Sequence, residues 1–397
     1  MKIERISICD FKALKNISFS PGFVNVFVGA NGTGKSTLLE AIGVLSAAMT
    51  DRVDGNALTR KGVRLSAPSL YKSAFNGAKR SQTISFDVTW RPSIQSELLK
   101  YAVHLNIPSD DNAWHYHSEA LFQGDSKIWG RSGRSKENYD NYVGMLLTDQ
   151  SENLISIRPS IEPFRSYAIY QPFTAALRGT IADPQQANPV GLGGGRLAEA
   201  LEELIHEVDG DLMVGDNTDI YLDEILEVID WADSISIGSP TKERVNSAIP
   251  VSRRVLEFKD KYLQDRMRFT AYDASEGALY VLFMFCLALH PKAPSVFAVD
   301  NFDQAMHPRL ARAVMRKISD IMIQQEKTIF LTTHNPLVLD GLDLSNDNIR
   351  LFTLNRSQKS GAVSIERIEI SSDLIKEKMS LSQLWTSGRI GGVPDLL

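Results

Sequence analysis

A glycine-rich segment reads GANGTGKS from Gly29 to Ser36 and fits the spacing G-x-x-x-x-G-K-[ST]. Small residues let consecutive backbone N–H groups converge on the closely spaced oxygens of a phosphate chain. Lys35 adds a point charge for the β- and γ-phosphates, and the Ser36 hydroxyl is suited to ligate Mg²⁺. The segment therefore predicts a site for ATP with Mg²⁺. The residues expected to bind the nucleotide are Gly29, Asn31, Gly32, Thr33, Gly34, Lys35, Ser36 and Thr37.

A second ligand for Mg²⁺ is expected from a carboxylate that ends another buried strand. The segment SVFAVD, Ser295 to Asp300, is apolar up to its aspartate. The charge of Asp300 is costly in such surroundings unless it meets a cation. We therefore expect Ser36 and Asp300 to share the metal ion. The alternative is an aspartate that only caps the following turn.

The elements around these residues occur in the order that a phosphate-binding loop requires. A short apolar run, Phe23 to Val28, predicts a buried strand that leads into the glycine-rich loop. Apolar residues at helical spacing follow in Lys35 to Met49. Near the other end of the chain, helices and strands alternate, which predicts an α/β fold with a mainly parallel sheet. The segments concerned are Glu276–Leu289, Ser295–Val299, Pro308–Gln325 and Thr328–Thr332, followed by strands at Ile349–Leu354 and Val363–Ile370.

The chain between these motifs is less regular and predicts an inserted α+β lobe. Apolar and polar residues alternate before the glycine-rich loop, from Ile3 to Phe19, which predicts two short strands joined by a turn. Strand-like runs follow the first helix at Thr83–Trp90, His115–Phe122 and Leu154–Arg158. We expect three parts, residues 1–50, 51–250 and 251–397. A second glycine-rich segment, Gly191 to Gly195, lacks the Lys-Ser pair and is interpreted as a loop before a helix.

Three further segments follow the glycine-rich loop in this order along the chain: YDASEGALYVL, FAVDNFDQAMHPRL and FLTTHNPLVL. This order resembles that of ABC-type ATPases of the SMC, RecF and OLD group, with only the head domain present. The resemblance implies that Ser275 and Gly277 belong to a signature segment, which faces the γ-phosphate bound by a second subunit. His334 matches the switch histidine, and His307 lies in the region of the D-loop. The expected assembly is a homodimer, or a higher homo-oligomer, around sandwiched ATP.

One residue departs from the pattern of this group. The position after the Walker B aspartate is usually glutamate, which polarises the attacking water, but here it is Asn301. Asparagine cannot accept a proton. Asp303 could replace it, or hydrolysis is slow. The catalytic residues that the resemblance implies are Lys35, Asp300, Asn301, Asp303 and His334. Gln82 and Gln171 are two candidates for the glutamine of the Q-loop.

The closing segment LSQLWTSGRIGGVPDLL resembles the end of small ATPases from bacterial mobile and antiphage defence loci. That resemblance implies a sensor or scaffold subunit with a separate effector, such as a nuclease. The segment after His334 is too short for the TOPRIM domain that OLD-type proteins carry. Two alternatives stay open: a RecF-like protein of DNA repair, and a structural module that binds ATP with little hydrolysis.

Composition narrows the class of partner. The formal net charge of −5 argues against coating nucleic acid by bulk charge alone. Binding of DNA by local basic segments, or a solvated basic surface, both stay open. No apolar stretch is long enough to span a membrane, and two cysteines, Cys9 and Cys286, are expected as reduced thiols in a cytoplasmic protein. The basic segments are Arg60, Lys61, Arg64, Lys72, Lys79 and Arg80, and Lys127, Arg131, Arg134 and Lys136 around Trp129.

Overall fold

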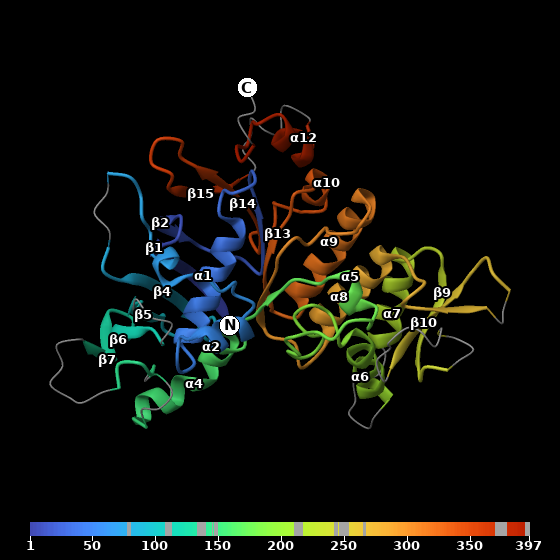
Figure 1. Cartoon of the computed structure of the whole chain (residues 1–397), viewed down its shortest axis with the longest axis horizontal. Helices are drawn as coiled ribbons and strands as arrows, with labels where there is room; N and C mark the ends of the chain where they lie inside the picture. The colour runs from blue at the N-terminus through green and yellow to red at the C-terminus, as the bar shows by residue number, and fades with distance from the viewer. Residues whose placement is uncertain are drawn as a thin grey trace.

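Two halves of the molecule flank a central sheet (Figure 1). The half that contains the N-terminal strands holds a second sheet and the first helix. The other half is mainly helical, and the C-terminal segment lies across one end. The computed structural model describes residues 1–77, 81–107, 113–132, 140–144, 146, 150–209, 217–241, 245, 254–264, 267–369 and 379–393.

The central sheet has the strand order β15-β14-β3-β13-β12-β8. All neighbouring strands in it are parallel except β14 and β15. Every residue of β3 and β12 is buried, as expected for parallel strands that are covered on both faces. The strands span Val24–Val28 (β3), Ile169–Tyr170 (β8), Val296–Val299 (β12), Thr328–Thr332 (β13), Ile349–Arg356 (β14) and Val363–Ile368 (β15).

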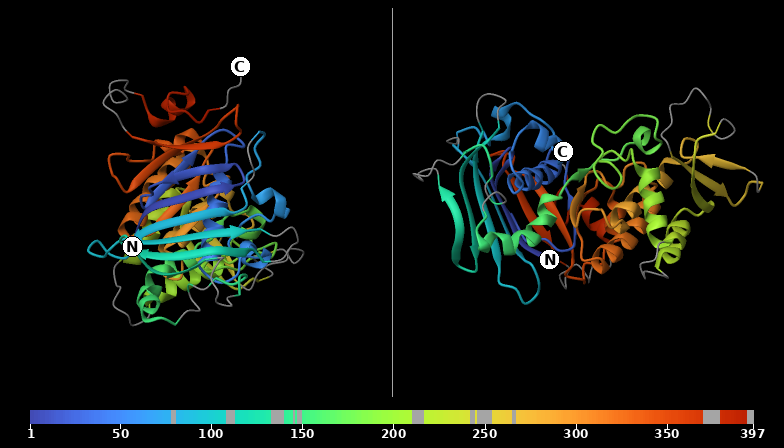
Figure 2. Two further views of the ribbon diagram at one scale, coloured as in Figure 1. Left: turned by 90° about the vertical axis from the view of Figure 1, so that its left-hand side faces the viewer. Right: turned by 90° about the horizontal axis from the view of Figure 1, so that it is seen from below.

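The outer sheet is antiparallel throughout and has the order β2-β1-β4-β5-β6-β7. Buried residues alternate with half-buried ones along β4, the pattern of a sheet with one face on the core. Figure 2 shows this sheet face-on in its left view. The strands span Lys2–Phe11 (β1), Leu14–Phe19 (β2), Ile84–Arg91 (β4), Leu99–Asn106 (β5), His115–Gln123 (β6) and Ser126–Ser132 (β7).

Alternate side chains of the central strands enter two separate cores. Val26 and Val28 of β3 pack with the helical half, whereas Phe27 packs with the outer sheet. Phe27 meets Phe19 of the outer sheet edge-on, with ring centroids 5.7 Å apart. The helix α1, Lys35–Ala48, lies in this second core with the outer sheet. The right view of Figure 2 shows the central sheet between the two halves.

The helical half is built around one apolar helix, α8 (Glu276–Leu289), in which every residue from Ala278 to Ala288 is buried. This confirms the predicted buried helix. A small antiparallel sheet in the order β11-β10-β9 lies at the far end of this half. Its strands span Ala232–Gly238 (β9), Val255–Asp260 (β10) and Arg268–Thr270 (β11). The other helices are α2 (Gly55–Arg60), α3 (Pro68–Tyr71), α4 (Glu152–Arg165), α5 (Thr174–Leu177), α6 (Leu197–Asp209), α7 (Asn217–Val228), α9 (Pro308–Gln324), α10 (Pro336–Leu339) and α12 (Leu381–Thr386).

At one segment the structure has a helix where the sequence predicts a strand. The strand predicted at Leu154–Arg158 is wrong, because these residues lie in α4. Leu154, Ile161 and Phe164 are buried, and their spacing places them on one face of a helix. A run of five residues is too short to distinguish this pattern from a strand.

The outer sheet also bears on how the chain divides. β1 pairs with β4, so strands from residues 1–50 and from residues 51–250 share one sheet. β9 and β10 pair across the second expected boundary in the same way. The division into three parts therefore stays a prediction. Of the predicted C-terminal strand, Ile370 lies outside the described residues.

Candidate nucleotide site

The glycine-rich loop joins the end of β3 to the start of α1. Gly34 precedes the helix with a left-handed φ of 95°, and no side chain caps the first turn. The N–H groups of that turn therefore point outward without an internal acceptor, which suits an anion. At Gly29 a Cβ would lie 2.6 Å from the carbonyl oxygen of Leu354 and 2.6 Å from Oγ1 of Thr33. Only glycine fits there, so the loop can lie close against β14.

Lys35 is a buried cation without a carboxylate at hydrogen-bonding distance among the described ion pairs. Its side chain is 6% exposed. Its Nζ donates to the carbonyl oxygens of Gly29 at 2.7 Å and Ala30 at 3.2 Å. Burial lowers the pKa of Lys35 to about 8, although the negative charge of Asp300 opposes this shift. A buried cation held by neutral carbonyls is a suitable partner for phosphate.

Asp300 follows β12 and lies at the same edge of the central sheet as the loop. Its side chain is buried and accepts a hydrogen bond from the hydroxyl of Thr332, at the end of β13. The same Thr332 oxygen accepts the N–H of Asn301 at 2.8 Å. Asn301 has a left-handed φ of 59°, which asparagine tolerates better than most residues. One threonine thus fixes both the aspartate and the turn after it.

The residues after β13 supply the next part of the site. Thr333 donates its hydroxyl to Oδ1 of Asp303 at 2.7 Å and accepts the N–H of Asn335 at 3.0 Å. His334 lies in the sequence between Thr333 and Asn335. Partial burial and the positive charge of Lys35 lower the pKa of His334, against the negative charges of Asp303 and Asp300. The structure therefore brings Lys35, Asp300, Asp303 and His334 within electrostatic range of one another.

The signature residues lie in the other half of the molecule. Ser275 caps α8, and its Oγ accepts the N–H of Ala278 at 3.3 Å. Ser275 is exposed, and α8 and α1 lie in opposite halves in Figure 1. Gly277 packs closely, because a Cβ there would lie 3.3 Å from the side chain of Leu310. His307 is also exposed and caps α9. Ser275 and His307 are therefore exposed caps at the starts of α8 and α9.

The two candidate glutamines lie beside different sheets, Gln171 at the central sheet and Gln82 at the outer sheet. Gln171 follows β8, which pairs in parallel with β12, so it lies at the edge that carries Asp300. The N–H of Asp300 donates to the carbonyl oxygen of Tyr170 at 3.0 Å, directly before Gln171. Gln82 precedes β4 of the outer sheet, and its carbonyl accepts a hydrogen bond from Lys72. The geometry favours Gln171 as the glutamine of the site.

Sequence analysis missed one charged cluster beside the loop. Glu40 of α1 is buried and accepts hydrogen bonds from Lys12 Nζ at 2.7 Å and Arg64 Nε at 2.6 Å. The available signal was a single acidic residue within an otherwise apolar helix. This cluster joins the turn after β1 and the segment after α2 to the helix that starts the site.

Backbone N–H groups of the second glycine-rich segment donate hydrogen bonds to a carboxylate of the protein itself. Asp183 is buried, and its Oδ2 accepts the N–H groups of Gly193 at 2.7 Å and Gly195 at 3.2 Å. These donors already have a negatively charged partner. The interpretation of Gly191 to Gly195 as a loop before a helix agrees with this arrangement.

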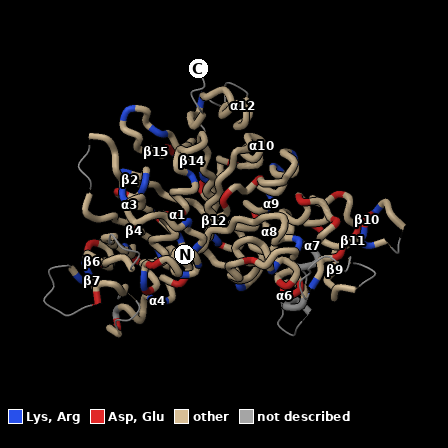
Figure 3. The backbone as a smooth tube through the Cα atoms, in the orientation of Figure 1, with Lys and Arg blue, Asp and Glu red and all other residues tan. Residues whose placement is uncertain are grey.

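Several basic residues that could have bound nucleic acid are already paired within the protein. Arg131 is buried, and its Nε lies 3.1 Å from a carboxylate oxygen of Glu119. Lys61 donates to the carbonyl oxygen of Arg165, and Lys72 to Oδ1 of Asn106. Lys and Arg are interspersed with Asp and Glu along the described chain (Figure 3). Lys79, Arg80, Arg134 and Lys136 lie outside the described residues.

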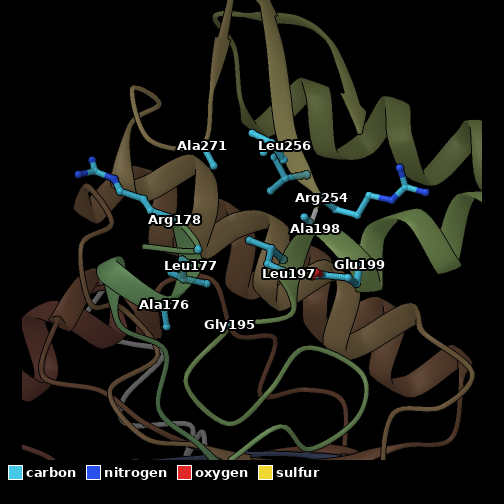
Figure 4. A pocket seen from close by; sticks show the side chains of 12 residues that line it. Ala176, Leu177, Arg178, Gly195, Leu197, Ala198, Glu199, Arg254, Leu256 and Ala271 are labelled. Atoms are coloured by element: carbon cyan, nitrogen blue, oxygen red, sulfur yellow. The ribbon is translucent and has the colours of Figure 1, made fainter. Parts of the chain in front are cut away.

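A small cavity lies near the signature segment, between α5, α6 and the β10–β11 hairpin. Its volume of about 20 Å³ has room for about one water molecule, not for a cofactor. Arg178 and Arg254 extend from it in opposite directions (Figure 4). Arg254 pairs with Glu202 at 2.8 Å.

Metal ligands, cysteines and membrane spans were considered among the described residues. No group of three or more His, Cys, Asp and Glu side chains among the described residues could hold a metal ion. Cys286 is buried, whereas Cys9 is half-buried. No helix in the described chain is both long and apolar enough to cross a membrane.

Comparison with known proteins finds a family model that matches most of the chain and curated relatives that match short parts of it. A family model described as "AAA domain, putative AbiEii toxin, Type IV TA system" matches residues 24–340. A DNA replication and repair protein RecF from Renibacterium salmoninarum is 42% identical over 55 residues, 13% of this chain and 14% of that protein. The RecF protein of Leifsonia xyli subsp. xyli is 38% identical over 68 residues, 16% of this chain and 17% of that protein. The chain thus covers only a small part of the length of these curated relatives.

Solved SMC heads share the fold across nearly the whole chain. An SMC head bound to the C-winged helix domain of ScpA has a TM-score of 0.57 at 11% identity, covering 95% of this chain and 100% of that one. An Smc head with an extended coiled coil, bound to the C-terminal domain of ScpA, derived from Pyrococcus furiosus, has a TM-score of 0.55 at 12% identity. It covers 95% of this chain and 98% of that one. These likenesses confirm the predicted fold class.

Proposed function

Because the chain belongs to this family of AAA domains and is an ABC-type P-loop ATPase of the SMC and RecF kind, we propose that it binds and hydrolyses ATP with Mg²⁺. One observation carries the proposal. The carboxyl ends of β3, β12 and β13 bring the buried cation Lys35, the carboxylate Asp300 and His334 to one edge of the central sheet. Ligands of open α/β sheets bind at such an edge.

The residues present fit Mg²⁺ and ATP. The uncapped first turn of α1 and the buried Lys35 would hold the phosphates. Ser36 and Asp300 provide hard oxygen ligands, which Mg²⁺ prefers. The bound Mg²⁺ and ATP would supply the phosphoanhydride bond that is broken and the charge that stabilises the leaving phosphate.

The carboxylate that acts on water is proposed to be Asp303. Asn301 cannot accept a proton, and its left-handed turn is fixed by Thr332. Asp303 is the next carboxylate along the turn, and Thr333, which precedes His334 in the segment after β13, orients it. A neutral His334, which a lowered pKa favours, would donate a hydrogen bond to a phosphate oxygen. Because Asp303 lies two residues beyond the usual glutamate position, we expect slow turnover.

We further propose that two copies sandwich ATP between them. Ser275 caps α8 at an exposed position, and α8 lies in the half of the molecule opposite α1. An exposed helix N-terminus suits a phosphate that a second subunit presents. Gly277 keeps the first turn of α8 close against α9, which supports this surface.

A role in a bacterial defence system, as sensor or scaffold beside a separate nuclease effector, is the finer part of the proposal. It is supported by the closing segment from Leu381 and by a family description that names a toxin and a toxin–antitoxin system. The RecF matches favour a role in DNA repair as the alternative, although each covers under 20% of this chain. An ATP-binding module with little hydrolysis is the third possibility, and Asn301 is its main support.

Steady-state phosphate release tests the enzyme activity directly. Wild type should release phosphate faster than Lys35→Ala in the presence of Mg²⁺, and chelation of Mg²⁺ should abolish the difference. Equal rates for the two proteins would leave only the ATP-binding module. For the biological role, phage plating on cells that carry the gene and its neighbours, with and without Lys35→Ala, separates defence from repair. Protection that depends on Lys35 supports defence, whereas sensitivity to DNA damage after gene deletion supports repair.

A further inference from the structure

The C-terminal segment from Ser380 to Gly392, here called the C-terminal clip, is well ordered by local features. Ser380 caps α12 and forms a capping box with Gln383. Leu384, Trp385 and Ile390 are buried in the same core as β3 and α8. In Figure 1 this segment lies across the end of the molecule, above β14 and α10. The clip is therefore a packed element rather than a loose tail.

The clip is bonded to the segment that carries His334. Asp340 ends α10, the helix that begins shortly after His334. Its carboxylate accepts the N–H of Ser382 at 2.9 Å and the Ser382 hydroxyl at 2.7 Å. Ser382 is buried, which shields both bonds from water. A displacement of α12 would therefore be transmitted to α10.

The other end of the clip lies against the phosphate-binding loop. The N–H of Gly392 donates to Oδ1 of Asn355, at the end of β14, at 2.9 Å. A Cβ at Gly392 would lie 3.3 Å from the Cα of Gly29. Gly29 is the residue whose carbonyl oxygen accepts the hydrogen bond from Lys35. Gly392 therefore supports the backbone that positions the phosphate-binding lysine.

Gly392 is closely surrounded, and two polar atoms near it have no hydrogen-bond partner among the described residues. The Cβ position of Gly392 lies 3.4 Å from Nε1 of Trp385 and 3.5 Å from Cβ of Thr353. Both Nε1 of Trp385 and Oγ1 of Thr353 are buried without a hydrogen-bond partner among the described residues. Such groups are costly to leave unpaired.

We propose that the C-terminal clip is a positioning element of the nucleotide site, which links the phosphate-binding loop to the His334 segment. Gly392 positions Gly29 and so the loop, and the Ser382–Asp340 pair positions α10 and so His334. The inference rests on the proposed function, since it concerns the same ATP site. It predicts that the two ends of the clip affect different kinetic constants: KM for ATP at Gly392 and kcat at Asp340.

Gly392→Ala tests the end at the loop. Gly392 has a φ of 71°, and its added Cβ would press on Gly29. We expect ATP binding with Mg²⁺, measured by calorimetry with the slowly hydrolysed analogue ATPγS, to weaken about tenfold. Gly77→Ala is the matched control, because Gly77 has a similar φ of 74° but lies outside the clip, and its Cβ would meet nothing within 4 Å. The control should lose comparable stability and bind ATPγS as wild type does.

Asp340→Asn tests the other end. It weakens the two hydrogen bonds from Ser382, so we expect kcat to fall about fivefold with little change in KM. Asp343→Asn is the control, because Asp343 bonds Ser345 in the same way but in an exposed loop. Asp340→Glu should restore part of kcat. If Asp340→Asn changes kcat and KM together, or leaves kcat unchanged, the positioning role given to Asp340 is wrong.

The outcomes separate this inference from the proposed function. If wild type binds ATPγS no better than Lys35→Ala, the proposed function fails and the inference fails with it. If wild type binds and Gly392→Ala binds equally well, only the inference is overturned. Should Gly392→Ala not fold, as judged by circular dichroism, Asn355→Ala replaces it, because it removes only the bond to the Gly392 N–H. Unchanged binding by Asn355→Ala would equally overturn the inference.

Discussion

Thr332 on β13 donates its hydroxyl to the carboxylate of Asp300 on β12. The same oxygen accepts the N–H of Asn301, so one hydroxyl determines the geometry of the turn that follows the buried strand. A parallel sheet makes this possible, because β12 and β13 pair in register up to Val299 and Leu331. The strand that leads to His334 thereby also positions Asp300, the aspartate proposed to bind Mg²⁺.

Thr332→Val should slow hydrolysis without unfolding the protein. The change keeps the shape but removes both hydrogen bonds, at a cost of about 1–3 kcal/mol in the free energy of unfolding. We expect kcat to fall about tenfold or more, because Asp300 loses its fixed orientation. Phosphate release at saturating ATP and Mg²⁺ measures the effect.

Thr353→Val is the matched control for this variant. Thr353 is also a buried threonine of the central sheet, but its Oγ1 has no hydrogen-bond partner among the described residues. Removal of that hydroxyl should therefore leave stability equal or slightly higher and kcat unchanged. Equal kcat for Thr332→Val and wild type would contradict the role given to Thr332.

Nucleotide binding should take up protons at alkaline pH. Burial lowers the pKa of Lys35 to about 8 in the free protein, and nearby phosphates would raise it. Free protein above this pH has a neutral Lys35, which must be protonated to hold the phosphates. The affinity for ATP should therefore fall as the pH rises above about 8, by up to about tenfold per pH unit.

Calorimetry in buffers of different ionisation enthalpy measures this uptake. It should be small at about pH 7 and exceed about half a proton at about pH 8.5. Lys61→Met is the control: burial lowers the pKa of Lys61 to about 8 as well, but its Nζ is bonded to the carbonyl oxygen of Arg165. Lys61→Met should take up as many protons on binding as wild type does. If proton uptake disappears in Lys61→Met, Lys35 is not the group that titrates.

How far sequence predicts this site depends on how local each feature is. The order from β3 through the loop to α1 is contained in a few dozen residues. The pattern at Gly29 to Ser36 and its flanking residues therefore predicts the strand, the loop and the helix together. The carboxyl ends of parallel strands lie at one edge of a sheet, and this geometry brings Asp300 and His334 near Lys35. The contact of Gly392 with Gly29 joins opposite ends of the chain and leaves no periodic signal. The pairing of β1 with β4 is similarly non-local, so the sequence pattern does not predict that these strands share one sheet.

Asp303 should be required for hydrolysis but not for binding. Asp303→Asn removes a carboxylate while Thr333 can still donate to the amide oxygen, so the fold of the turn should persist. We expect phosphate release to fall about 100-fold with unchanged affinity for ATPγS. Asp320→Asn, at an exposed position of α9, is the control and should behave as wild type. Asn301→Glu, which restores the usual residue, should raise kcat, although a left-handed φ costs glutamate about 1 kcal/mol or more.

Ser275→Arg should separate binding from association. Ser275 is exposed at the start of α8, so a long cationic side chain is accommodated in the isolated subunit. In a dimer it would occupy the space between the two heads, where the signature segment is proposed to meet the partner's ATP. We expect ATPγS binding to stay within about twofold of wild type, and the ATP-dependent dimer to be lost in light scattering after size-exclusion chromatography. Ser93→Arg, at an exposed position after β4, is the matched control and should dimerise normally. A Ser275→Arg protein that dimerises with ATP as wild type does would show that the signature segment is not at the interface.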